Sequence, residues 1–233
     1  MHARSYGCGR VLFQISRAAA AAAAAAICSA LLLPGTVVPG ASAEVVKVVA
    51  LGDSLTAGLG LPANDGFVAR LQAALAAKGI TAQIENAGVS GDTASAGLAR
   101  LDWSVPLGTD AVILELGAND MLRGVNPQVT RDALDAILRR LTERHIAVLL
   151  CGMRAMPNLG VDYVRSFERI YPELAGKYGV LFYPFFLDGP AADLSLTQAD
   201  GLHPNAAGVG AIVARILPRV EELIARVRHA TPS

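Results

Sequence analysis

Apolar residues gather along this chain in five short runs, and the segments between the runs have helical spacing. The runs are rich in β-branched and aliphatic residues, which is typical of buried strands. In the helical segments, apolar residues recur every three or four positions, and those of residues 134–141 lie at i, i+3, i+4 and i+7, the pattern of an amphipathic helix. The predicted strands are residues 45–51, 81–85, 111–116, 146–151 and 180–183, and the helical stripes cover 67–75, 134–141, 164–174 and 212–227.

This alternation of strands and helices predicts an α/β fold. Strands that are apolar on both faces are typical of a parallel sheet covered by helices on two sides. We therefore expect a three-layer α/β/α sandwich with a central parallel sheet of about five strands and right-handed crossovers. No repeat or low-complexity linker interrupts the chain after residue 43.

The first 43 residues differ from the rest of the chain. A basic segment ends at Arg17, an apolar run covers residues 18–33, and the small-x-small sequence 41–43 follows a Pro-Gly break. This order is typical of a secretory signal peptide. We expect residues 1–43 to be a leader cleaved after Ala43 and residues 44–233 to be one domain. The alternative is an uncleaved membrane anchor, for which the run is short compared with the roughly 20 apolar residues of a span.

Composition narrows the class of protein further. Hydrophobic residues make up 53% of the chain and charged residues 17%, which excludes a disordered protein. The part after the leader has a slight excess of acidic residues, so no nucleic-acid partner is expected. It also keeps only one cysteine, Cys151, which lies in an apolar run and is expected to be a buried, inert thiol. A monomer without a stable membrane anchor is the expectation.

Polar and glycine-rich segments follow four of the predicted elements. In a parallel sheet, ligands bind beyond the carboxyl ends of the strands, so these segments should meet there. The segments are Gly52-Asp53-Ser54-Leu55, the stretch from Asn86 to Thr93, Gly117-Ala118-Asn119-Asp120, and Asp200-Gly201-Leu202-His203-Pro204.

Three of these residues form a candidate catalytic triad. A serine hydroxyl needs an adjacent base to become a nucleophile, and Ser54 is the candidate nucleophile. His203 is the candidate base, and Asp200 can fix the tautomer of its ring from three residues earlier. Each residue also has an ordinary interpretation, because Ser54 could cap a helix and the other two could belong to a surface turn.

Backbone and side-chain donors suggest a candidate oxyanion hole. The Ser54 N–H, the Gly91 N–H and the Asn119 side-chain amide would together supply three donors to a developing negative charge. The alternative is that Gly91 and Asn119 only form turns. Asp92 and Thr93 are expected to cap the next helix.

At these residues the chain resembles the SGNH (GDSL) hydrolases. The four family blocks correspond to Ser54 in GDSL, Gly91 in VSGDT, Asn119 in GAND and His203 in DGLHP, and the resemblance covers residues 46–225. The phrases LPANDGFVARL, LGANDMLRG and RIYPELAGKYGV resemble the branch of bacterial thioesterase I/protease I/lysophospholipase L1-like arylesterases.

The resemblance implies a flavodoxin-like fold and a periplasmic or secreted bacterial enzyme. It implies hydrolysis of carboxylic esters or thioesters through an acyl-enzyme, with no metal and no cofactor. Expected substrates are aryl esters, acyl-CoA-like thioesters and lysophospholipids. It also implies a mobile loop over residues 121–126 that closes over the acyl chain.

Apolar residues near the active end are expected to contact the substrate. The candidates are Met121, Leu122, Met156 and Phe186, since an apolar surround suits an acyl group and methionine adapts to chains of different length. Two other functions remain open from the sequence: a carbohydrate acetyl-esterase of the same fold, and a flavodoxin-like binding module without catalysis.

Overall fold

A computed structural model describes residues 1–2 and 45–230. The expected leader and its cleavage site after Ala43 lie outside the described residues. Residues 45–230 belong to one compact unit. None of the helices in this part of the chain combines the length and the apolarity that a bilayer crossing requires.

The centre of the fold is a five-stranded parallel sheet, as the sequence predicts. Its strands are paired in the order β2-β1-β3-β4-β5, the flavodoxin-like order, with a switch point between β1 and β3. Gly52 at the end of β1 pairs with Gly88 of β2 and with Glu115 of β3, so three carboxyl ends lie level. The strands are β1 Val46–Gly52, β2 Ala82–Gly88, β3 Ala111–Glu115, β4 Ala147–Cys151 and β5 Leu181–Tyr183.

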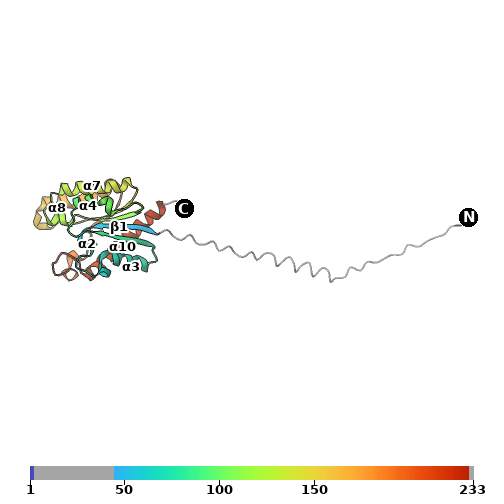
Figure 1. Ribbon diagram of the computed structural model, residues 1–233, viewed down its shortest axis with the longest axis horizontal. Coiled ribbons are helices and arrows are strands. Elements are labelled where there is room, and N and C mark those ends of the chain that lie inside the picture. The colour runs from blue at the N-terminus through green and yellow to red at the C-terminus, as the bar shows by residue number, and fades with distance from the viewer. Residues whose placement is uncertain (3–44, 231–233) are drawn as a thin grey trace. The chain divides into compact units, whose positions relative to one another are not determined.

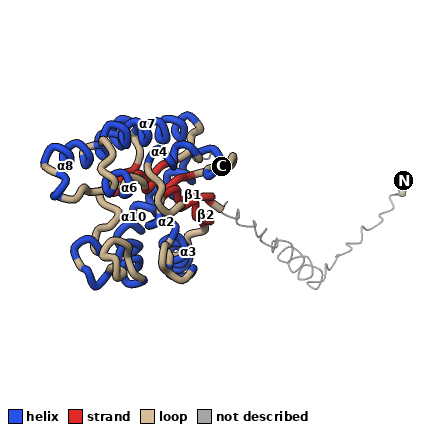
Figure 2. The backbone as a smooth tube through the Cα atoms, turned by 60° about the vertical axis from the view of Figure 1, so that its left-hand side comes forward, coloured by secondary structure: helices blue, strands red, loops and turns tan. Residues whose placement is uncertain are grey.

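Helices cover both faces of this sheet (Figures 1 and 2). Helices α2, α3 and α10 lie on one side of β1, and α4, α7 and α8 lie on the other (Figure 1). The helices are α2 Ser54–Ala57, α3 Phe67–Ala77, α4 Ala94–Ala99, α5 Leu101–Ser104, α6 Ala118–Leu122, α7 Pro127–Glu143, α8 Val161–Glu168, α9 Ile170–Tyr178 and α10 Ala206–Ala230.

The apolar pattern explains this packing. All five residues of β3 are buried, and so are the four leucine and isoleucine residues of the stripe on α7. Cys151 at the end of β4 is buried and free, and burial raises the pKa of its thiol well above the ordinary value. Fully burying an aliphatic side chain such as those of β3 and α7 contributes about 1.5–3 kcal/mol to the free energy of unfolding. The core on the two faces of the sheet is therefore the main source of stability.

Two elements differ from the sequence prediction. Strand β2 continues to Gly88, because Asn86 and Ala87 keep pairing with β1 despite their low strand propensity. The predicted helix over 164–174 is two helices, α8 and α9, that meet at Arg169. Pro172 explains the break, since proline has no N–H to donate to the carbonyl four residues earlier and its ring crowds that carbonyl.

Candidate active site

Ser54 lies where β1 ends and α2 begins, at the carboxyl edge of the sheet. Only 8% of its surface is exposed. The residue that caps α2 is Asp53, whose Oδ1 accepts a hydrogen bond from the Leu55 N–H at 3.0 Å. Since Asp53 satisfies the helix end, the capping interpretation of Ser54 is wrong, and its hydroxyl is left for another partner.

That partner is His203. The Nε2 atom of His203 lies 2.9 Å from Ser54 Oγ, and its Nδ1 atom lies 2.5 Å from Asp200 Oδ2. The structure therefore brings together the three predicted triad residues, although Ser54 and His203 are 149 positions apart. The imidazole stands between a hydroxyl and a carboxylate, as a general base requires.

The loop before α10 holds Asp200 in place. Its Oδ1 accepts the N–H groups of Leu202 and His203, at 2.9 and 3.0 Å, while Oδ2 faces the imidazole. The Leu202 N–H and then the His203 ring lower the pKa of Asp200 to about 2. The carboxylate is therefore ionised at every pH where the protein is expected to work.

The predicted oxyanion donors lie beside Ser54. Gly91 and Asn119 both line the cavity that contains Ser54 and His203. Gly91 has φ of +88°, a conformation that favours glycine. Its carbonyl accepts a hydrogen bond at 2.8 Å from the exposed Arg123. The Asn119 Nδ2 donates to Asp53 Oδ2 at 3.0 Å, which leaves its second N–H available to a substrate.

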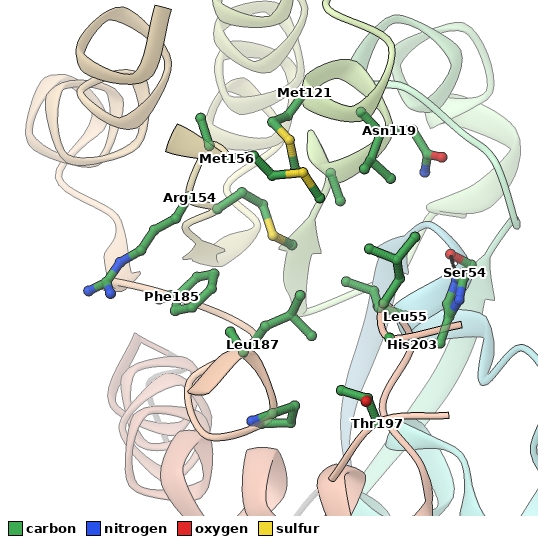
Figure 3. Close-up of a pocket in the computed structure, with 18 of the residues that line it drawn as sticks. Ser54, Leu55, Asn119, Met121, Arg154, Met156, Phe185, Leu187, Thr197 and His203 are labelled. Carbon is green, nitrogen blue, oxygen red and sulfur yellow. Dashed lines mark hydrogen bonds between the residues drawn. The ribbon is translucent and has the colours of Figure 1, made fainter. Parts of the chain in front are cut away.

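The cavity has a volume of about 640 Å³ and is lined mainly by apolar side chains. Figure 3 shows Ser54 and His203 at one end and Arg154 beside Phe185 at the other. The predicted contacts Met121, Leu122 and Met156 line it. Other apolar lining residues include Leu55, Met153, Phe185 and Leu187.

Phe186 is a correction to the prediction. It is fully buried in the core and packs edge-to-face on Phe67, with ring centroids 5.0 Å apart. Its N–H donates to the Gly152 carbonyl at 2.9 Å, which turns the side chain inward. The neighbouring Phe185 lines the cavity instead, and its ring lies 4.8 Å below the Arg154 guanidinium.

Arg100, the residue after α4, joins the ends of β1 and β2. Its side chain donates to the carbonyls of Gly52 and Ala87, both at 2.9 Å, and pairs with Asp92 at 2.6 Å. Asp92 is therefore an ion-pair partner and not a helix cap, whereas Thr93 caps α4 as predicted. These hydrogen bonds hold the carboxyl ends of β1 and β2 together, directly before Ser54.

Two carboxyl groups are buried behind the site. Asp53 and Glu115 are both fully buried, and Glu115 Oε2 accepts hydrogen bonds from Thr56 Oγ1 at 2.7 Å and from the Asp53 N–H at 3.4 Å. Glu115 Oε1 has no hydrogen-bond partner among the described residues. Burial raises the pKa of Asp53 to about 6, and burial together with the Asp53 charge raises the pKa of Glu115 well above 4.5.

Replacing Glu115 with glutamine is expected to make stability less dependent on pH. In the folded protein Glu115 keeps its proton above pH 4.5, whereas in the unfolded chain it releases the proton near that pH. The free energy of unfolding of the wild-type protein should therefore lose up to about 1.4 kcal/mol per pH unit above pH 4.5 through this residue. Denaturant unfolding at pH 5 and pH 8 measures the difference.

The control for this prediction is Glu143→Gln, at an exposed position near the end of α7. Relative to wild type, the Glu115→Gln variant should gain stability between pH 5 and pH 8, and Glu143→Gln should not. A constant difference between Glu115→Gln and wild type across this range would mean that Glu115 is ionised in the folded protein.

Comparison with known proteins identifies the family. Residues 50–211 match the GDSL-like lipase/acylhydrolase family. The chain is 37% identical over 185 residues to "Esterase TesA" of Pseudomonas aeruginosa, covering 79% of this chain and 91% of that protein. It is 38% identical over 166 residues to "Arylesterase" of Vibrio mimicus, covering 71% and 83%.

Solved structures agree with these sequence relatives. The crystal structure of TesA superimposes with a TM-score of 0.72 at 35% identity, covering 76% of this chain and 99% of that one. The esterase AlinE4, described as an SGNH hydrolase, has a TM-score of 0.66 at 44% identity, covering 82% and 98%. With the fold, the order of the sequence blocks and these relatives in agreement, the chain belongs to the GDSL-like lipase/acylhydrolase family of serine ester hydrolases.

Proposed function

We propose that Ser54, His203 and Asp200 are the catalytic triad of this ester hydrolase. The observation that carries the proposal is the hydrogen-bonded chain from Ser54 Oγ through the His203 ring to Asp200, at 2.9 and 2.5 Å. A capping role does not account for this arrangement, since Asp53 already caps α2.

The reaction proceeds in two halves. His203 takes the Ser54 proton while Oγ attacks the substrate carbonyl, and the ionised Asp200 stabilises the imidazolium. The Ser54 N–H, the Gly91 N–H and the free Asn119 N–H donate to the oxyanion. His203 then protonates the leaving alcohol or thiol, which leaves an acyl-enzyme. Water, deprotonated by His203, attacks this ester and releases the acid.

The substrate proposed for this site is an ester or thioester with an apolar acyl chain. A cavity of about 640 Å³ is much larger than an acetyl group, and its wall contains three flexible methionines, Met121, Met153 and Met156. The size and lining of the cavity favour esters with long apolar acyl chains over the acetylated sugars that a carbohydrate acetyl-esterase, the alternative function, would bind. An acetyl xylan esterase among the solved structures is 22% identical and shares the fold alone.

Hydrolysis of p-nitrophenyl esters from C2 to C16 tests the substrate class. The expected result is an optimum of kcat/KM at a chain longer than C4, because each additional buried CH₂ contributes about 0.8 kcal/mol until the cavity is filled. An optimum at C2 would instead support the acetyl-esterase. No turnover of any ester would contradict the proposed function as a whole.

We also propose that the protein is exported and works as a monomer. The basic, apolar and small-residue segments of residues 1–43 support a leader that is removed after Ala43. Periplasmic or secreted location follows from that proposal. The ester panel is therefore measured on a chain that begins at Glu44.

A further inference from the structure

Asp53 makes two separate contacts from its buried position between β1 and α2. Its Oδ1 accepts the Leu55 N–H at 3.0 Å, which is a normal helix cap. Its Oδ2 accepts the side-chain N–H of Asn119 at 3.0 Å, from helix α6, 66 positions away in the sequence. A capping role explains the first contact and does not explain the second.

The second contact decides how the Asn119 amide is oriented. An amide has a donor end, Nδ2, and an acceptor end, Oδ1, and only the donor end is attracted to a carboxylate. With Nδ2 held by Asp53, its other N–H is free to point at the substrate. In the flipped orientation two oxygens would face each other at Asp53, and Asn119 would turn an acceptor toward the oxyanion.

We propose that Asp53 is a positioning residue for the reaction, because its carboxylate selects the amide orientation in which Asn119 donates to the oxyanion. The inference rests on the oxyanion role of Asn119 proposed above. Asp53 does not touch the substrate: it does not line the cavity, whereas Ser54, Gly91 and Asn119 do.

Asp53 and Glu115 share one negative charge, and the charge lies on Asp53 because Glu115 is protonated. Two buried carboxyl groups this close do not both ionise, and Glu115 has an oxygen, unpartnered within the described chain, that can carry the proton. Burial opposes a charge on Asp53, but the hydrogen bonds from the Leu55 N–H and the Asn119 amide both favour its ionised form. Asp92 opposes this charge, but it is itself neutralised by Arg100.

Gly52, at the end of β1, lies directly against the Glu115 and Thr56 side chains of this junction. A side chain at Gly52 would place its Cβ 2.6 Å from Glu115 Oε2 and 2.1 Å from Thr56 Oγ1. Only glycine at position 52 leaves room for the Glu115 carboxyl group and the Thr56 hydroxyl to meet behind Ser54. The contact between Asp53 and Asn119 is therefore part of a closely packed junction and not a chance surface contact.

Asp53→Asn is the first test. The new side chain has one oxygen and one NH₂ group, and the fixed Leu55 N–H holds the oxygen, so the NH₂ group faces Asn119 and Asn119 loses its acceptor. We expect kcat for p-nitrophenyl butyrate to fall about 10²-fold or more, the usual cost of losing an oxyanion donor, while KM changes less than about threefold. Asp53→Ser is the second variant, because serine still caps α2 but cannot reach Asn119, and the same loss is expected.

A double-mutant cycle separates positioning from general damage. If Asp53 acts through Asn119, Asp53→Asn should lower kcat no more than about threefold in an Asn119→Ala background. An equal loss in both backgrounds would overturn the proposal, and so would a wild-type kcat in Asp53→Asn or Asp53→Ser. Thr56→Val is the matched control: it removes a buried hydrogen bond at the same junction and should change melting temperature but not kcat.

The cycle also distinguishes this inference from the proposed function. If Asn119→Ala keeps full activity, the oxyanion assignment is wrong and the positioning role falls with it. If Asn119→Ala loses activity and Asp53→Asn does not, the oxyanion assignment stands and only the positioning role is overturned.

Discussion

Ser54→Ala is expected to lower kcat about 10⁴- to 10⁶-fold while the protein remains folded. The loss is large because no acyl-enzyme can form without the hydroxyl, and the oxyanion donors alone supply only the residual rate. The fold should tolerate the change, since Ser54 Oγ bonds to His203 and not to the scaffold, and Asp53 caps the helix.

Steady-state hydrolysis and thermal unfolding together check this result. The control is Ser195→Ala, at an exposed serine that bonds to Asp193 away from the triad, and its kcat should stay within about twofold of wild type. If Ser54→Ala keeps its activity and its fold, the nucleophile is another residue and the proposed mechanism fails.

Asp200→Asn is expected to lower kcat about 10³- to 10⁴-fold. The Oδ1 atom of Asp200 accepts two backbone N–H groups, so the oxygen of the substituted amide is held there and its NH₂ group must face His203 Nδ1. Nδ1 then has to accept, the ring proton moves to Nε2, and Nε2 can no longer take the Ser54 proton. The wrong tautomer, more than the lost charge, stops the reaction.

The pH–rate profile and a matched variant check this prediction. Asp193→Asn changes an aspartate with the same kind of turn bond, to the Ser195 N–H at 2.9 Å, outside the triad. It should leave kcat within about threefold of wild type. A loss of less than tenfold in Asp200→Asn would show that the histidine tautomer is set by another group.

The fold followed from the sequence because its signals are local and redundant. Four of the five strands, β1, β3, β4 and β5, are mainly apolar, and errors occurred where tertiary contacts override propensity, as in the extension of β2 to Gly88. The site could also be predicted, because triad and oxyanion chemistry needs particular residue types and a parallel sheet brings its strand ends together.

Side-chain direction was harder to predict than residue type. Phe185 and Phe186 are adjacent aromatics after β5, and nothing in their sequence says which faces the cavity; the Phe186 hydrogen bond to Gly152 decides it. Glu115 is the one charged residue in the apolar run 111–116, a pattern that indicates only that it needs a partner. Its place beneath Asp53 depends on the register between β1 and β3, which spacing alone does not give.

The separation between Ser54 and His203 along the chain has a consequence for folding. Closing a loop of 149 residues is entropically costly, so this contact is expected to form late, after the sheet and α10 have docked. A partly synthesised or still unfolded chain therefore holds a serine without its base. Hydrolysis begins only when the last helix is in place, which makes enzymatic turnover a direct reporter of complete folding.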